Sequence, residues 1–286
     1  MDLSAKVDWL RVSLPNDTPL REILPHSEGL QIGHDNVRPF PRYTRAYRFK
    51  AGGRVDWNPD QPQQKTLLTF TGSDLDAQQL TGVQAVELAG ALSAAPGATV
   101  TRLDLAIDIL ESGADPQTVH DAYVKGEVKS HVRQVDRFDR YRRGQPRAGV
   151  NIQFGSRTGE RCLRVYDKSA EQGTADPWTR LELELKRAQG MRAAEAIQAQ
   201  PVSQVAAGLI RELMKTGVPW FEQALDECAA GSFTAAKPGR KQTNSERWLY
   251  ETATPAFLAA LEAGDVKTMR ALLSYLEDRG LTLTNL

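Results

Sequence analysis

The sequence predicts an α+β fold, in which a mainly antiparallel β-sheet with flanking helices precedes a helical C-terminal region. Segments rich in β-branched and aromatic residues, separated by turn residues, recur up to about residue 186 and are typical of strands. From Gly190 onward the segments are rich in Ala and Leu and contain few strand formers. We therefore expect a sheet-containing domain over residues 1–205 and a helical domain over residues 206–286, with the boundary near 205.

The expected strands cover residues 7–14, 43–50, 65–72, 99–110, 149–156, 161–168 and 178–186. Residues 75–95 read as helical with a break near Gly82, and a short helix follows Asp115, which suits an N-cap and precedes Pro116. The basic stretch 129–149 contains Gly and Pro and is expected to be partly loop. The short connection between the strands 149–156 and 161–168 predicts an antiparallel hairpin.

Bulk composition excludes several classes of protein. The chain has 286 residues, with 36 Lys and Arg against 36 Asp and Glu, so its net charge gives no sign of a nucleic-acid partner. Two cysteines, Cys162 and Cys228, provide neither a disulfide framework nor a zinc site, which favours a reducing compartment. No apolar run approaches the ~20 residues of a membrane span, and the N-terminus lacks the apolar core of a signal peptide. We expect a cytoplasmic protein with no membrane partner.

Positive charge is concentrated in one part of the chain. Residues 125–168 contain twelve Lys and Arg against five Asp and Glu. This surplus is consistent with binding to a polyanion and equally with a solvated loop that acids elsewhere balance.

Three of the expected strands carry apolar side chains on one face and polar side chains on the other. They are TRLDLAID (101–108), RCLRVYDK (161–168) and RLELELK (180–186). Because residues two apart in a strand point the same way, each strand is predicted to be half-buried. The polar sides carry Arg102, Asp104 and Asp108 in the first strand, Arg164, Tyr166 and Lys168 in the second, and Glu182 and Glu184 in the third.

If these strands are neighbours, several carboxylates gather beside Tyr166. Clustered carboxylates repel one another unless a cation neutralises them, and hard oxygen ligands suit Mg²⁺ or Mn²⁺. A divalent ion beside a phenol indicates phosphoryl transfer, in which the phenol attacks a phosphate and forms a covalent phosphotyrosine. The alternative is the ordinary solvated face of an antiparallel sheet. The two-residue spacing of Glu182 and Glu184, with no basic residue between them, argues against an ordinary solvated face.

The stretches TRLDLAID, FGSRTGERCLRVYDKSAEQ and WTRLELELK, in this order, resemble the replication initiation factor family. That family includes rolling-circle initiators of plasmids and filamentous phages and relaxases of integrative elements. The resemblance covers about residues 65–190. It implies a metal-dependent nicking and joining enzyme, which binds a double-strand origin, cuts one strand and stays joined to the 5′ end through a tyrosine.

The resemblance also assigns roles to individual residues. Tyr166 would be the nucleophile, Arg164, Lys168 and Arg157 would hold the scissile phosphate, and Asp104, Glu182 and Glu184, with Asp108 as a fourth, would bind Mg²⁺ or Mn²⁺. Further DNA contacts are expected from Arg161, Arg140, Arg142, Arg143 and Arg102. The partners would be origin DNA in double-stranded and single-stranded form, a host helicase and a second copy of the chain. One departure is NIQF before the FGS turn, where relatives often carry another aromatic residue.

Three alternatives remain open. Tyr141, among arginines in DRYRRG, is the rival nucleophile, although no acids lie near it in sequence. The same scaffold could serve a regulator that binds an origin or promoter without cutting, or a metal-dependent phosphodiesterase that uses water, with Tyr166 structural. The other major class of rolling-circle initiator uses a histidine–hydrophobic–histidine metal motif, and none of the four histidines has that arrangement.

Overall fold

The computed structural model describes residues 1–20, 32–34, 37–80, 84–110, 113–141 and 147–229. Within a compact unit, Met1–Ala235, the strands are β1 (Leu3–Leu14), β2 (Ile32–His34), β3 (Arg45–Phe49), β4 (Arg54–Trp57), β5 (Thr66–Thr71), β6 (Thr99–Ile109), β7 (Lys129–Ser130), β8 (Val135–Tyr141), β9 (Arg147–Phe154), β10 (Arg161–Asp167), β11 (Thr179–Leu185) and β12 (Met214–Lys215). The helices are α2 (Gly72–Leu80), α3 (Ala85–Ala94), α4 (Pro116–Val124), α5 (Lys168–Gln172), α6 (Arg187–Ala199), α7 (Val202–Leu213) and α8 (Pro219–Ala229).

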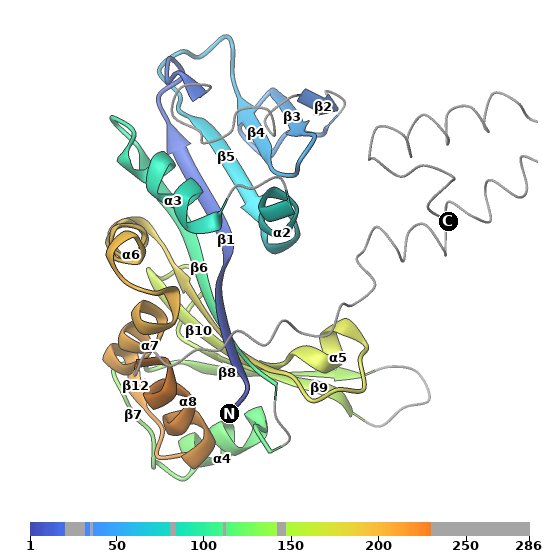
Figure 1. Ribbon diagram of the computed structural model, residues 1–286, viewed down its shortest axis with the longest axis vertical. Coiled ribbons are helices and arrows are strands. Elements are labelled where there is room, and N and C mark those ends of the chain that lie inside the picture. Colours follow the sequence, from blue (N-terminus) through green and yellow to red (C-terminus); the bar gives the residue numbers. More distant parts are fainter. Residues whose placement is uncertain (21–31, 35–36, 81–83, 111–112, 142–146, 230–286) are drawn as a thin grey trace, which may run out of the picture. The chain divides into compact units, whose positions relative to one another are not determined.

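One large antiparallel sheet organises this unit, which confirms the predicted α+β class. Its strand order is β2-β3-β4-β5-β1-β6-β11-β10-β9-β8, and β12 and β7 form a separate pair. The long strands β1 and β6 run through the middle and join the two halves (Figure 1). The three strands with one polar face, β6, β11 and β10, are consecutive neighbours in the sheet.

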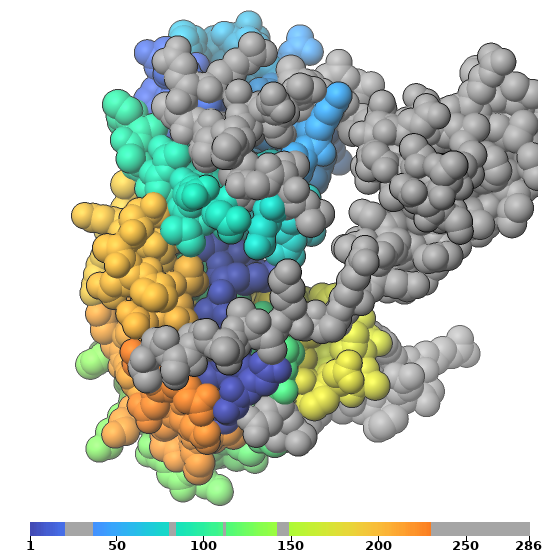
Figure 2. All heavy atoms as spheres, in the orientation of Figure 1, coloured from blue at the N-terminus to red at the C-terminus, as the bar shows by residue number. Residues whose placement is uncertain are grey.

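Helices cover the apolar face of the sheet. The inward leucines of β6 and β11, such as Leu103, Leu105 and Leu183, are completely buried, as their alternation predicts. Helices α3, α6 and α7 pack on β1 and β6, and α4 packs on β9 (Figure 1). In Figure 2 the atoms of α3 (teal) meet those of α6 (gold) along this layer. The opposite face carries the polar side chains, and the short helix α5 lies on that side (Figure 1).

Local sequence features account for several boundaries. The Asp115 side chain accepts a hydrogen bond from Gln117 N at 2.9 Å and caps α4, which begins at Pro116 as predicted. The predicted hairpin is formed by β9 and β10, and Gly155 in its turn has a φ of 92°, a conformation that favours glycine. The predicted helical stretch 75–95 is divided into α2 and α3.

Two features differ from the sequence-based expectation. The basic stretch expected to be partly loop contains β8, an edge strand whose side chains are mostly exposed, so it has no apolar alternation to reveal it. The expected boundary near residue 205 lies inside α7, whose buried face packs on β1 and β6. Arg142, Arg143 and residues 230–286 of the expected C-terminal domain lie outside the described residues.

Candidate active site on the polar face of the sheet

Strand register brings the predicted site residues together. Glu184 of β11 lies opposite Asp104 of β6, and Glu182 lies opposite Arg164 of β10. Tyr166 is two residues beyond Arg164 on the same face. Residues separated by up to 80 positions in the chain therefore share one small area of the sheet.

The phenol of Tyr166 is held by a carboxylate. Its hydroxyl donates a hydrogen bond to Glu182 Oε2 at 2.7 Å, and the residue is only 6% exposed. Burial, followed by the negative charge of Glu182, raises the pKa of Tyr166 well above its usual value. The phenol is consequently neutral at rest, and the group that would accept its proton is already in contact with it.

Two arginines neutralise the three carboxylates Asp104, Glu182 and Glu184. Arg102 Nε donates to Asp104 Oδ1 at 2.9 Å, and Arg102 Nη2 lies 3.2 Å from Glu184 Oε2. Arg164 forms an ion pair with Glu182, and its Nη2 lies 3.9 Å from Asp104 Oδ2. Each acid in this acid cluster therefore shares its cations with another acid.

The pKa values of two acids in the cluster, Asp104 and Glu184, shift in opposite directions. Burial, together with the charges of Glu182 and Glu184, raises the pKa of Asp104 to about 7 despite the contact with Arg102. At Glu184 burial acts in the same direction, but the hydrogen bond from Lys186 and the charge of Arg102 outweigh it and lower the pKa. Burial therefore disfavours the charged form of Asp104 even beside Arg102.

The acid cluster matches Mg²⁺ or Mn²⁺ in donor chemistry, because it offers carboxylate oxygens from two adjacent strands. In the described part of the chain, no group of three or more His, Cys, Asp or Glu side chains is gathered as a metal site. The acids contact the guanidinium groups of Arg102 and Arg164 instead.

Asp108, the expected fourth ligand, belongs to a different network. Its two oxygens accept hydrogen bonds from Arg180 Nε and Nη2 at 2.6 and 2.8 Å, and Trp178 Nε1 donates to it at 2.6 Å. Arg180 Nη1 also lies 2.9 Å from Asp8 Oδ1. Although burial opposes its charge, these acids raise the pKa of Arg180 above its usual value.

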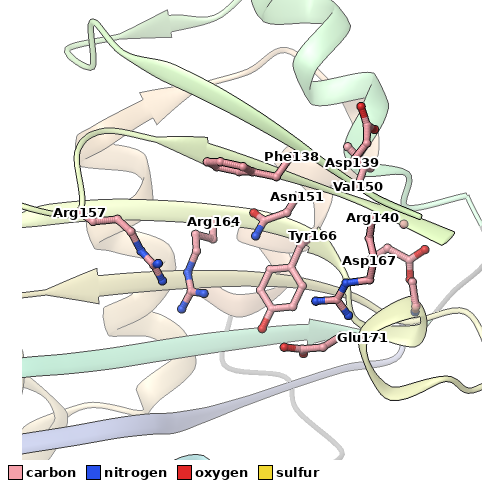
Figure 3. Close-up of a pocket in the computed structure, with 12 residues that line it drawn as sticks. Phe138, Asp139, Arg140, Val150, Asn151, Arg157, Arg164, Tyr166, Asp167 and Glu171 are labelled. Carbon is pink, nitrogen blue, oxygen red and sulfur yellow. The ribbon is translucent and has the colours of Figure 1, made fainter. Parts of the chain in front are cut away.

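A pocket of about 410 Å³ opens beside Tyr166. It is lined by Phe138, Asp139, Arg140, Gly149, Val150, Asn151, Arg157, Arg164, Tyr166, Asp167, Ala170 and Glu171, most of which are shown in Figure 3. Arg157 and Arg164 lie on one side of the phenol, and Arg140 and Glu171 lie on the other (Figure 3). Gly149 is required here, because a Cβ at this position would lie 2.5 Å from the Ala170 Cβ of α5.

Two polar atoms in this pocket lack partners among the described residues. They are Arg164 Nε, a donor, and Asn151 Oδ1, an acceptor. Asn151 lies opposite Tyr166 in the sheet register. Buried polar atoms without partners are costly, so both atoms favour a ligand or solvent in the pocket.

The remaining predicted residues divide between the pocket and other surfaces. Lys168 pairs with Glu171, and its Nζ lies 5.6 Å from the centre of the Tyr166 ring. Arg161 instead lies near Glu212 of α7, with an Nη1–Oε2 distance of 3.4 Å. The rival nucleophile Tyr141 is 70% exposed at the end of β8.

Sequence reasoning missed several residues of the pocket. Phe138 is 54% exposed on the edge strand β8, and Asn151 and Glu171 line the same pocket. An exposed aromatic residue between arginines in DRFDRYRR was the available indication for Phe138. Asn151 and Glu171 have no such indication, because their importance comes only from the sheet register and from α5.

The replication initiation factor family model matches residues 98–272, more than half of the chain. The chain belongs to this family. Among solved structures it is similar to a rolling-circle replication initiator protein from Geobacillus stearothermophilus, with 21% identity, a TM-score of 0.63, and coverage of 75% of this chain and 86% of that chain. This likeness indicates a shared fold. No curated protein matches the chain.

Among the described helices, none has both the length and the apolar character that a bilayer span requires.

Proposed function

We propose that this protein is a rolling-circle replication initiator that nicks one strand of an origin through Tyr166. The observation that carries the proposal is the hydrogen bond from Tyr166 to Glu182 at the edge of an arginine-lined pocket. Family membership supports a role in replication initiation, and the fold of the Geobacillus initiator supports the rolling-circle type. Its DNA partner would be an origin, bound as a duplex and cut as a single strand, and a host helicase would unwind it.

The proposed reaction exchanges one phosphodiester for another. The Tyr166 oxygen attacks the scissile phosphorus and transfers its proton to Glu182, the acceptor 2.7 Å away. The bond from phosphorus to the 3′ oxygen breaks, and that oxygen leaves with a proton from solvent. The products are a free 3′ hydroxyl and a 5′-phosphotyrosine. Joining is the reverse attack by a 3′ hydroxyl, which loses its proton to solvent while Glu182 returns a proton to the departing phenolate of Tyr166.

Positive charge in the pocket favours this reaction. Arg164 Nε has no partner among the described residues and is available to a phosphate oxygen, and Arg140 and Arg157 line the same pocket. Guanidinium groups stabilise the charge that develops on a phosphoryl group during transfer. Because burial and Glu182 raise the pKa of Tyr166, this stabilisation is needed before the phenol can attack.

A divalent cation, Mg²⁺ or Mn²⁺, belongs to the proposal. Asp104, Glu182 and Glu184 are the residues that would hold it, in place of their present contacts with Arg102, Arg164 and Lys186. When bound, such an ion polarises a phosphoryl oxygen and lowers the pKa of a nearby oxygen nucleophile.

A nicking assay tests the proposal with two matched tyrosine variants. Supercoiled plasmid with the cognate origin is incubated with protein and Mg²⁺ or Mn²⁺, and nicked DNA and covalently attached protein are measured. Tyr166→Phe removes one oxygen and is expected to abolish nicking and attachment while it preserves binding to the origin. Tyr141→Phe, the matched control, is expected to nick like the wild type.

Each outcome selects one function. Normal nicking by Tyr166→Phe contradicts the assignment. Nicking without attached protein favours a phosphodiesterase that uses water. Binding without nicking by the wild type favours a non-cleaving regulator, for which the burial of Tyr166 is the supporting observation.

A further inference from the structure

A row of alternating arginine and aromatic side chains lies on the polar face, on the side of the acid cluster away from Tyr166. The guanidinium carbon of Arg102 lies 4.4 Å from the centre of the Trp9 ring, and that of Arg11 lies 5.5 Å from the same ring. Arg11 also lies 5.2 Å from the Phe40 ring, and Arg54 lies 3.9 Å from it. The order is Arg102, Trp9, Arg11, Phe40 and Arg54, which we call the arginine file.

Strand geometry places the arginine file on the same face as the acid cluster. Leu10 and Val12 are fully buried on the helix-covered face, so Trp9 and Arg11 point the other way. Arg11 lies opposite Arg102 in the register of β1 and β6, and a register shift after Val7 brings Trp9 opposite Asp104. The file is therefore continuous with the site, through the contacts of Arg102 with Asp104 and Glu184.

The arginine file has more positive charge than its partners neutralise. Arg54 pairs with Asp56 and Arg102 with Asp104, but Arg11 forms no ion pair with a described carboxylate. Its Nε donates instead to Thr69 Oγ1 at 3.3 Å. Burial and the nearby charge of Arg102 lower the pKa of Arg11, and the charges of Asp56 and Asp104 offset them only in part.

The aromatic side chains hold the guanidinium groups in place. An arginine stacked on a ring keeps its N–H groups free at the edge of the plane for a phosphate oxygen. Trp9 Nε1 is a further buried donor with no partner in the described structure. An anion bound beside Arg11 would supply the ion pair that this guanidinium group does not have among the described carboxylates.

The spacing suits an extended strand of nucleic acid. From β4 to β10 the sheet order passes through β5, β1, β6 and β11. With neighbouring strands about 4.8 Å apart, this path is roughly 24 Å long and ends at Tyr166. Single-stranded DNA is bound in this way elsewhere, by basic surfaces interrupted by aromatic side chains.

We propose that the arginine file is a binding track for the phosphate backbone of single-stranded DNA and that it leads the strand to the Tyr166 pocket. This inference rests on the proposed function for the identity of its ligand. Most of the track precedes the part of the chain that matches the family model, which begins at residue 98. The N-terminal strands would therefore act in substrate binding as well as in completing the sheet.

The test measures binding of a fluorescent single-stranded oligonucleotide by anisotropy, with full-length protein and no divalent cation, as a function of salt. Arg11→Gln is expected to weaken binding about tenfold, the effect of one charge-assisted contact. It should also reduce the slope of log affinity against log salt by about 0.7, the contribution of one phosphate contact. Arg11→Lys keeps the charge and should retain the slope.

Arg192→Gln is the matched control. It removes the same charge from α6, where Arg192 pairs with Glu212 at 2.7 Å, and it should leave affinity and slope unchanged. Thermal unfolding of each variant verifies that the protein is folded.

Two results would overturn the inference: an unchanged slope for folded Arg11→Gln, or an equal loss for Arg192→Gln. A larger loss for duplex than for single-stranded DNA would also contradict it. Because the assay contains no cleavage step, a failed nicking assay leaves this result intact, and a failed binding test leaves the assignment of Tyr166 intact.

Discussion

Asp104 and Asp108 lie four residues apart on the same face of β6, yet their environments differ. Asp108 is buried and accepts three hydrogen bonds, two from Arg180 and one from Trp178. Asp104 shares Arg102 with Glu184 and is close to Arg164, the partner of Glu182. Its pKa is raised to about 7.

The difference separates a structural ion pair from a group of acids that can exchange partners. At Asp108 the geometry is complete, so another cation has no place and the network fixes β6 against β11. At the acid cluster three carboxylates share Arg102, Arg164 and Lys186, and a neighbouring pocket contains polar atoms without partners among the described residues. Perturbed pKa values beside a pocket are typical of functional sites.

The largest expected effect is on cleavage by Glu182→Gln. The amide still accepts the hydrogen bond from Tyr166 but no longer takes its proton, so the rate of nicking should fall by about 10²–10⁴-fold. Single-turnover nicking of origin DNA measures it. Glu171→Gln, on the other side of the phenol, removes the acid that pairs with Lys168 and should change the rate far less. Equal losses in both variants would show that Glu182 has no special role.

The next largest effect is on stability and concerns the ion pair between Arg180 and Asp108. Arg180→Met leaves Asp108 buried without its cation, while Asp8 keeps Lys6 at 3.5 Å, and the free energy of unfolding should fall by about 3–5 kcal/mol. Urea denaturation measures this change. Arg102→Met should cost less, because Lys186 still pairs with Glu184 and Arg164 still lies near Asp104. The comparison fails if removal of Arg102 destabilises the protein as much as removal of Arg180.

The third effect, the smallest when expressed per pH unit, is a dependence of stability on pH. Asp104 keeps its proton in the folded state up to a pKa of about 7, whereas in the unfolded state it loses the proton near 3.8. The folded state therefore binds more protons between these values, and the free energy of unfolding that Asp104 contributes falls as the pH rises, by up to about 1.4 kcal/mol per pH unit. Asp104→Asn should become more stable relative to wild type between pH 5 and pH 7. Urea denaturation of both proteins at pH 5 and pH 7 measures this change, and an equal pH dependence in the two proteins would contradict the prediction.

The sequence predicted the strands of the site well, because leucine alternation in TRLDLAID and RLELELK is a local property. The hairpin and the cap of α4 were predictable for the same reason. Strand β8 was missed, since an exposed edge strand has no apolar face to reveal it. Adjacency of β6, β11 and β10 was a hypothesis that only tertiary structure could confirm.

Side-chain partnerships were the least predictable part of the site. The pattern indicated a group of acids around a cation, but it did not reveal that Arg102 and Arg164 are their present partners. The pattern also did not distinguish the environment of Asp108 from that of Asp104, because both residues lie on the polar side of one strand. The arginine file depends on β1 and on rings outside the recognised motifs.

The most direct test of the central claim identifies the residue that becomes attached to DNA. Wild-type protein is incubated with origin DNA and a divalent cation, digested with nuclease and trypsin, and the nucleotide-linked peptide is sequenced by mass spectrometry. The expected peptide is VYDK, residues 165–168, with the phosphate on Tyr166. A nucleotide on Tyr141, or nicked DNA with no linked peptide, would contradict the account.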